Sequence, residues 1–150
     1  MLKLKDSAPQ FELENYDSKK SSLKDFIGKK IVLYFYPKDD TPGCTAEACS
    51  FRDVYDDIIK KGAVVIGISP DNIKSHKKFK TKFNLPFYLL ADTDHKVSEI
   101  YGVWGEKKMY GKTYFGIIRS TFIIDEQGLI KKIFPKVTPA GHSKEVLESI

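Results

Sequence analysis

The sequence has few thiols and no long apolar run. Only two of its 150 residues are cysteines, Cys44 and Cys49. The longest apolar runs, Ile31–Tyr36 and Ala63–Ile68, are far shorter than the about 20 residues that a membrane-spanning helix needs. The N-terminal residues are charged from Lys3 onward and include no apolar segment of a signal peptide. We therefore expect a cytoplasmic protein that makes no contact with a membrane, and in that compartment a permanent structural disulfide is disfavoured.

The composition is that of an ordinary globular chain, with 41% hydrophobic and 30% charged residues. A length of 150 residues suits one domain, so we expect a single domain spanning 1–150. The net charge of +5 is densest in the lysines between Lys74 and Lys82. No aromatic interleaving or known binding motif accompanies these lysines. We interpret them as a solvated helix face and expect no nucleic-acid partner.

Strand and helix patterns alternate along the chain. Buried strands are expected at Ile31–Tyr36, Ala63–Ser69 and Phe87–Asp92, with a further strand near Phe11 and a hairpin of Arg119–Asp125 and Leu129–Val137. Helices are expected at Pro42–Lys60, from an Asp71 N-cap to Phe83, at His95–Tyr101 and at Ser143–Ile150. The aromatic residues Trp104, Tyr110, Tyr114 and Phe115 are expected to pack a loop. This order predicts an α/β thioredoxin-like fold: a central mixed sheet flanked by helices, with an N-terminal β extension.

Both cysteines lie in one stretch, "YPKDDTPGCTAEACSFRD", residues 36–53. Thr41 can cap a helix in which Pro42 takes the first position. Gly43 and Cys44 then fall in the first turn, where backbone amides have no intrahelical partner and the helix dipole favours an anion. A thiolate is such an anion, and a nearby cation would stabilise it further. Arg119 is the candidate cation, since a strand next to Ile31–Tyr36 would bring it alongside.

The spacing of the two cysteines excludes a disulfide within an intact helix. Residues five apart in an α-helix have Cα atoms roughly 8–9 Å apart, beyond the ~7 Å that an unstrained disulfide tolerates. A bond between Cys44 and Cys49 would require the first turns to unwind, which suits a redox cycle better than a structural staple. A structural zinc site needs four ligands, and His76, His95 and His142 are too widely spread to complete one. Two inert buried thiols remain the alternative.

This stretch resembles the signature of the peroxiredoxins, specifically of the bacterioferritin comigratory protein (peroxiredoxin Q) subfamily. The family pattern is Pro, three residues, Thr or Ser, two residues, Cys, and Pro37, Thr41 and Cys44 match it. The subfamily adds a second cysteine five residues later, which Cys49 matches. The later segments "DNIKSHKKF", "FNLPFYLLAD", "RSTFIID" and "GHSKEVL" resemble the family in the same order.

The resemblance implies a thioredoxin fold, peroxide reduction and a role for each matching residue. Cys44 resembles the peroxidatic cysteine, which attacks the peroxide and becomes a sulfenic acid. Thr41 resembles the hydroxyl that hydrogen-bonds the peroxide, and Pro37 the residue that shields the pocket. Arg119 resembles the arginine that stabilises the thiolate and the leaving oxygen. Glu47 resembles the glutamate that orients this arginine.

The same resemblance implies the rest of the cycle. Cys49 resembles the resolving cysteine, which forms an intrachain disulfide with Cys44 that thioredoxin or a similar dithiol then reduces. The amides of Gly43 and Cys44 would join Arg119 in binding the substrate. No metal, flavin or haem cofactor is required, and the subfamily is commonly monomeric. Two alternatives remain open: a thiol–disulfide oxidoreductase, which usually has a Cys-x-x-Cys motif absent here, and a redox sensor.

Overall fold

The computed structural model describes residues 1–150 and contains a seven-stranded mixed sheet and a separate two-stranded sheet. The large sheet has the strand order β2-β1-β5-β4-β3-β8-β9. Its strands are β1 (Glu12–Asn15), β2 (Lys20–Ser22), β3 (Lys30–Phe35), β4 (Ala63–Ser69), β5 (Tyr88–Ala91), β8 (Ser120–Ile124) and β9 (Ile130–Phe134). The helices are the 3₁₀ helix η1 (Leu23–Phe26), α1 (Pro42–Asp53), α2 (Tyr55–Lys60), α3 (Ile73–Phe83), α4 (Lys96–Ile100) and α5 (His142–Ser149).

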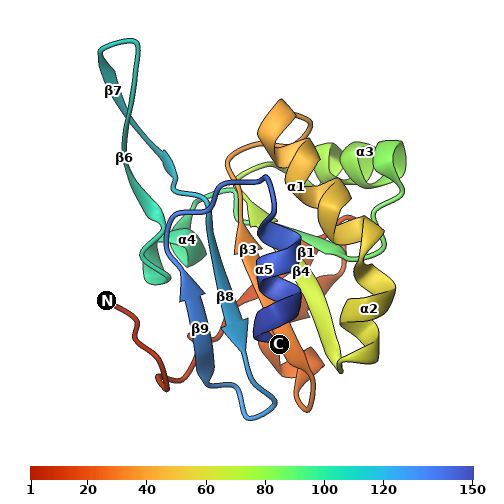
Figure 1. Cartoon of the computed structure of the whole chain (residues 1–150). Helices are drawn as coiled ribbons and strands as arrows, with labels where there is room; N and C mark the ends of the chain where they lie inside the picture. Colours follow the sequence, from red (N-terminus) through yellow and green to blue (C-terminus); the bar gives the residue numbers. More distant parts are fainter.

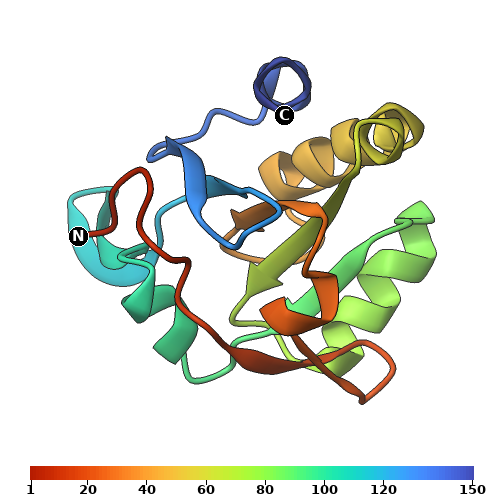
Figure 2. The same cartoon turned by 90° about the horizontal axis from the view of Figure 1, so that it is seen from below.

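Helices cover both faces of the large sheet, and α4 and α5 lie on opposite sides of it (Figures 1 and 2). Alternate residues of β3 enter two separate cores: Leu33 packs in one, and Val32 and Tyr34 in the other. The second core takes side chains from α1, α2, α3 and α5, such as Phe51 of α1. Because both faces are covered, β3 is apolar over almost its whole length, as the continuous run in the sequence predicts.

The central position of β3 brings distant segments to one end of the sheet. β3 pairs in parallel with β4 and antiparallel with β8. Phe35, at the end of β3, lies opposite Ser120, at the start of β8. Arg119 immediately precedes Ser120. It therefore lies beside the loop that leads from β3 into α1, as the strand pairing expected from the sequence requires.

The single helix expected over Pro42–Lys60 is wrong, because the chain forms α1 and α2 with a break at Val54. The Val54 amide donates to the carbonyl of Phe51 in a tighter turn than an α-helix makes. The expected N-cap at Asp71 is also wrong. Asn72 caps α3 by accepting from the Ser75 amide at 2.9 Å.

The expected loop of aromatic residues is instead a β-hairpin. Its strands are β6 (Trp104–Met109) and β7 (Lys112–Ile117). Tyr110 and Gly111 both have positive φ, which is the geometry of a tight two-residue hairpin turn. The hairpin projects well beyond the large sheet (Figure 1), and Tyr110 is almost fully exposed. None of the helices combines the length and apolar character that crossing a bilayer requires.

Candidate thiol active site

Cys44 is buried in the first turn of α1. Thr41 is the N-cap residue and Pro42 follows at the first helical position, as the sequence predicts. The Thr41 hydroxyl does not cap the helix, however, because it donates to the carbonyl of Lys38 at 2.9 Å. The amides of Gly43 and Cys44 belong to the first turn, which has no carbonyl within the helix to accept from them. The sulfur therefore lies at the positive end of the helix dipole.

Arg119 reaches this sulfur across 75 residues of sequence. Its Nη2 donates to Cys44 Sγ at 3.3 Å, and its Nη1 donates to Glu47 Oε1 at 2.7 Å. The Arg119 side chain is only 15% exposed, so water screens these contacts weakly. A Cβ at Gly43 would lie 3.2 Å from Nη2. The absence of a side chain at position 43 therefore leaves room for the guanidinium.

Glu47 is fully buried one turn after Cys44, and its Oε2 has no hydrogen-bond partner. Burial raises the pKa of Glu47 from its ordinary value of 4.5 to about 7, against the opposing attraction of Arg119. The neighbouring Tyr34 hydroxyl is also buried without a partner. Burial first, and then the nearby Glu47 and Cys44, raise the pKa of Tyr34 well above its usual range. The carboxyl group of Glu47 therefore holds a proton more readily than an exposed glutamate does.

The raised pKa of Glu47 predicts a pH-dependent stability. The folded state holds the proton more tightly than the unfolded state, so this contribution to stability is complete below about pH 4.5 and is lost as pH rises through about 7. Glu47→Gln removes the titration, and we expect its free energy of unfolding to fall less over this range than that of the unmodified protein. The difference should be on the order of a few kcal/mol. Urea unfolding at several pH values measures both profiles, and parallel profiles would contradict the assignment.

The two other site residues expected from the sequence are Pro37 and Cys49, and they lie in the loop before α1 and in α1 itself. Pro37 is half-buried two residues after the end of β3, in the loop that also holds Thr41. Cys49 is half-buried in α1, five residues beyond Cys44, and both thiols are free. Because α1 is continuous from Pro42 to Asp53, the expected separation of the two cysteines within an unbroken helix applies to this form of the protein.

A cavity of about 510 Å³ is lined in part by Arg119. It also includes Lys107, which was not among the site residues expected from the sequence. It is lined by Glu106, Lys107, Lys108, Ile118, Arg119, Lys136 and Val137. Lys107 Nζ donates to the carbonyl of Ile117 at 2.8 Å. Burial and the nearby Arg119 charge lower the pKa of Lys107. Its position on β6, within the unexpected hairpin, explains why no pattern in the sequence singled it out.

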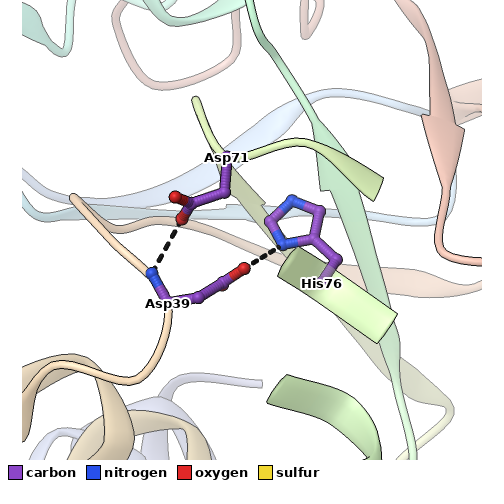
Figure 3. A group of neighbouring side chains, drawn as sticks. All are labelled: Asp39, Asp71 and His76. Carbon is purple, nitrogen blue, oxygen red and sulfur yellow. Dashed lines mark hydrogen bonds and ion pairs between the residues drawn. The ribbon is translucent and has the colours of Figure 1, made fainter. Parts of the chain in front are cut away.

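A second group of chemically active side chains was also missed. Asp39, Asp71 and His76 offer ligand atoms that lie within 4.8 Å of one another (Figure 3). These residue types bind metals, but here Asp39 already pairs with His76, and Asp71 accepts from the amide of Asp39. The group is therefore a hydrogen-bonded cluster. Asp39 and Asp71 follow the adjacent parallel strands β3 and β4. The position of each aspartate just after a predicted strand could have indicated that the two lie close together.

The chain resembles several known proteins over nearly its whole length. It is 50% identical over 143 residues to peroxiredoxin Bcp of Bacillus subtilis, covering 95% of this chain and 91% of that protein. The structure of a cysteine-to-serine mutant of Xylella fastidiosa PrxQ has a TM-score of 0.93 and 34% identity, covering 99% of this chain and 94% of that one. The Xanthomonas campestris bacterioferritin comigratory protein has a TM-score of 0.87 and 38% identity, covering 92% and 88%.

This combination of thioredoxin-like fold and buried, guanidinium-bound thiol defines a peroxiredoxin, that is, a thiol peroxidase. The chain belongs to the AhpC/TSA family, whose model matches residues 4–133. Within that family it belongs to the Bcp/PrxQ subfamily. The fold and the family expected from the sequence are thereby confirmed.

Proposed function

We propose that this protein reduces hydrogen peroxide and organic hydroperoxides in antioxidant defence, with Cys44 as the nucleophile. The observation that carries the proposal is the contact of Arg119 Nη2 with Cys44 Sγ at 3.3 Å, with the Arg119 side chain only 15% exposed. A guanidinium there favours the thiolate, the nucleophilic form of cysteine. The related Xanthomonas campestris protein has alkyl peroxide reduction activity, which supports the substrate class.

In the first step, the Cys44 thiolate attacks one peroxide oxygen. A sulfur–oxygen bond forms and the oxygen–oxygen bond breaks, so that the sulfur is oxidised to a sulfenic acid and the peroxide is reduced to an alcohol or water. The departing oxygen takes up a proton. Arg119 and the first-turn amides of Gly43 and Cys44 supply donors for its developing charge. Thr41 keeps lone pairs to accept from the peroxide while its hydroxyl donates to Lys38, and Pro37 shields the pocket.

In the second step, the Cys49 thiol condenses with the sulfenic acid to give an intrachain disulfide and water. Both cysteines lie in the continuous helix α1, where their Cα atoms are too far apart for this bond. The first turns of α1 must therefore unwind before resolution. Cys49 is half-buried rather than enclosed, which supports its ability to leave the helix.

The disulfide is then reduced by thioredoxin or a similar dithiol, which supplies two electrons and two protons. Sulfur carries the electrons throughout, so the cycle requires no cofactor. We propose that residues 1–150 work as one peroxiredoxin domain and as a monomer in the cytoplasm.

Cys49→Ser separates the two steps. With thioredoxin, thioredoxin reductase and NADPH, we expect the unmodified protein to consume peroxide continuously and the variant to consume about one equivalent, because its sulfenic acid has no resolving partner. Trapping with a sulfenic-acid reagent and peptide mass mapping should place the product on Cys44. If the unmodified protein also stops after one equivalent, a redox sensor is the better interpretation. Continuous turnover of the variant would disprove the role of Cys49.

A further inference from the structure

The Asp39–His76 pair lies outside the thiol site but is joined to it by a short segment of chain. Asp39 follows β3 and precedes the Thr41 N-cap of α1 by two residues. His76 lies on α3, 37 residues later in the sequence. In Figure 3 the His76 ring faces the Asp39 carboxylate, and the Asp39 backbone nitrogen faces Asp71. The segment that enters the active-site helix is thus attached to two other elements of the fold.

The pair is almost fully enclosed, since the side chain of His76 is 0% exposed and that of Asp39 is 4% exposed. His76 Nδ1 lies 2.7 Å from Asp39 Oδ2, and His76 Nε2 lies 3.0 Å from the carbonyl oxygen of Leu90. A carbonyl oxygen only accepts, and the carboxylate oxygen already accepts from Ser75 at 2.7 Å. Nε2 therefore donates to the Leu90 carbonyl, and Nδ1 forms a buried hydrogen bond with the Asp39 carboxyl group.

Further hydrogen bonds fix Asp39 from other directions. Its Oδ1 accepts from the Tyr36 hydroxyl at 2.5 Å. Its backbone amide donates to Asp71 Oδ2 at 2.7 Å, and the same Asp71 oxygen accepts from the Ser69 hydroxyl at 2.8 Å. Asp39 is thereby attached to the end of β3, to the end of β4 and, through His76, to α3.

The turn held by Asp39 leads directly into the site. Asp40 has a φ of +57°, in the left-handed region that residues other than glycine rarely adopt. The Thr41 hydroxyl closes this turn on the Lys38 carbonyl. The side chain of Asp40 makes only an exposed ion pair with Lys82, and such a surface pair stabilises the conformation of the turn very little. The buried contacts of Asp39 are therefore the main restraint on the turn that places Thr41 and starts α1.

We propose that Asp39 and His76 are positioning residues: their buried hydrogen bond holds the Lys38–Thr41 turn against α3 and delays the unwinding of α1 that brings Cys44 to Cys49. This inference rests on the proposed function, because the unwinding matters only if the two cysteines condense. While the turn is held, Cys44 stays in its reactive geometry toward peroxide. When it is released, the sulfenic acid and the Cys49 thiol form the disulfide and water.

The pair would then control a competition at the oxidised sulfur. A Cys44 sulfenic acid that stays in the folded helix can meet a second peroxide, whose oxygen transfer gives a sulfinic acid and an alcohol or water. A sulfenic acid released from the helix reacts with Cys49 instead. A firmly held turn therefore favours fast peroxide reduction and greater overoxidation, and a loosened turn favours the disulfide.

His76→Gln tests this by removing the imidazole ring that joins Asp39 to the carbonyl of Leu90. We expect the first reaction with peroxide to slow about tenfold, since small displacements of catalytic groups cost one to two orders of magnitude. We expect disulfide formation to accelerate about tenfold, because loss of buried hydrogen bonds loosens the structure that they hold. At high peroxide the sulfinic fraction should fall accordingly. Rapid quenching with thiol alkylation and mass spectrometry follows both products.

Two further variants complete the experiment. Lys82→Met removes the exposed ion pair of the same turn and should leave both rates unchanged, because surface pairs contribute little. Ser75→Ala removes one hydrogen bond to Asp39 and leaves the His76 contacts in place, so it should shift both rates in the direction of His76→Gln but by less. If His76→Gln does not fold, Ser75→Ala and Lys82→Met still make the comparison.

Unchanged ratios of sulfinic acid to disulfide in Ser75→Ala and His76→Gln would overturn the proposal, even if peroxide reduction slowed. Amide hydrogen exchange provides a test independent of the redox chemistry. Residues 38–45 should exchange faster in His76→Gln than in Lys82→Met, and equal exchange also overturns the proposal. If the unmodified protein forms no Cys44–Cys49 disulfide, the proposed resolving step fails, and exchange alone decides whether the pair holds the turn.

Discussion

Cys44→Ser should abolish peroxide consumption, with a loss of at least about 10³-fold in the rate of the first reaction. The serine hydroxyl has nearly the same size as the thiol but stays protonated at neutral pH, so Arg119 has no anion to stabilise. Its oxygen also cannot store two electrons as sulfur does in the sulfenic acid. A peroxide-consumption assay on the reduced protein measures the loss.

The stability of the Cys44→Ser variant is the control for this prediction. Cys44 packs in the core between α1 and the sheet, and serine leaves no large cavity there. We therefore expect urea unfolding of Cys44→Ser to remain cooperative, so that lost activity reports lost chemistry. A variant that retains more than about a tenth of the activity would exclude Cys44 as the nucleophile.

Arg119→Met should lower the rate of the first reaction by about 10²–10³-fold, the usual cost of removing one donor from a developing oxyanion. Methionine keeps much of the apolar stem of arginine but neither of its donating nitrogens. The Cys44 sulfur then loses its cation and the leaving oxygen loses a donor. Stopped-flow measurement of peroxide reduction by the reduced protein follows the change.

Two companion variants distinguish charge from geometry. Arg119→Lys keeps the charge, but an ammonium cannot reproduce the fork that joins Cys44 Sγ to Glu47 Oε1, so we expect most of the activity to be lost. The double variant Arg119→Met, Glu47→Gln removes the carboxylate that Arg119→Met leaves without a partner. It should recover stability relative to Arg119→Met and recover no activity. Recovery of activity would mean that Arg119 acts only by pairing with the Glu47 carboxylate.

Much of the site could be predicted from the sequence because the start of α1, which holds Cys44, depends on residues that are neighbours in the chain. An N-cap at Thr41, Pro42 at the next position and Cys44 in the first turn depend on neighbours within a few residues, which decide where a helix starts. The same is true of the Cys44–Cys49 spacing. The apolar run of β3 likewise indicated a strand covered on both faces. The expected strand order also indicated Arg119 as the nearby cation, and the family resemblance added the proposed role of Glu47.

The errors of the sequence reasoning share a physical cause. The break at Val54 and the N-cap at Asn72 each depend on a balance between similar local alternatives, which packing decides. The β6–β7 hairpin was missed because its residues form a separate two-stranded sheet, and its exposed aromatic residues resemble those of a loop. Asp71 was expected to cap α3, but instead it accepts from the amide of Asp39.

The sequence by itself determined where α1 starts, that Cys44 lies in its first turn and that Cys49 follows five residues later in the same helix, because these properties depend on residues close together in the chain. Only the tertiary structure decided that Arg119, from 75 residues away, donates to both Cys44 Sγ and Glu47, and that His76 holds Asp39 from 37 residues away. Such contacts arise from strand order: β8 and β4 flank β3, and α3 packs beside its end. The sequence of each strand or helix is compatible with many strand orders, and packing of the whole core selects one of them.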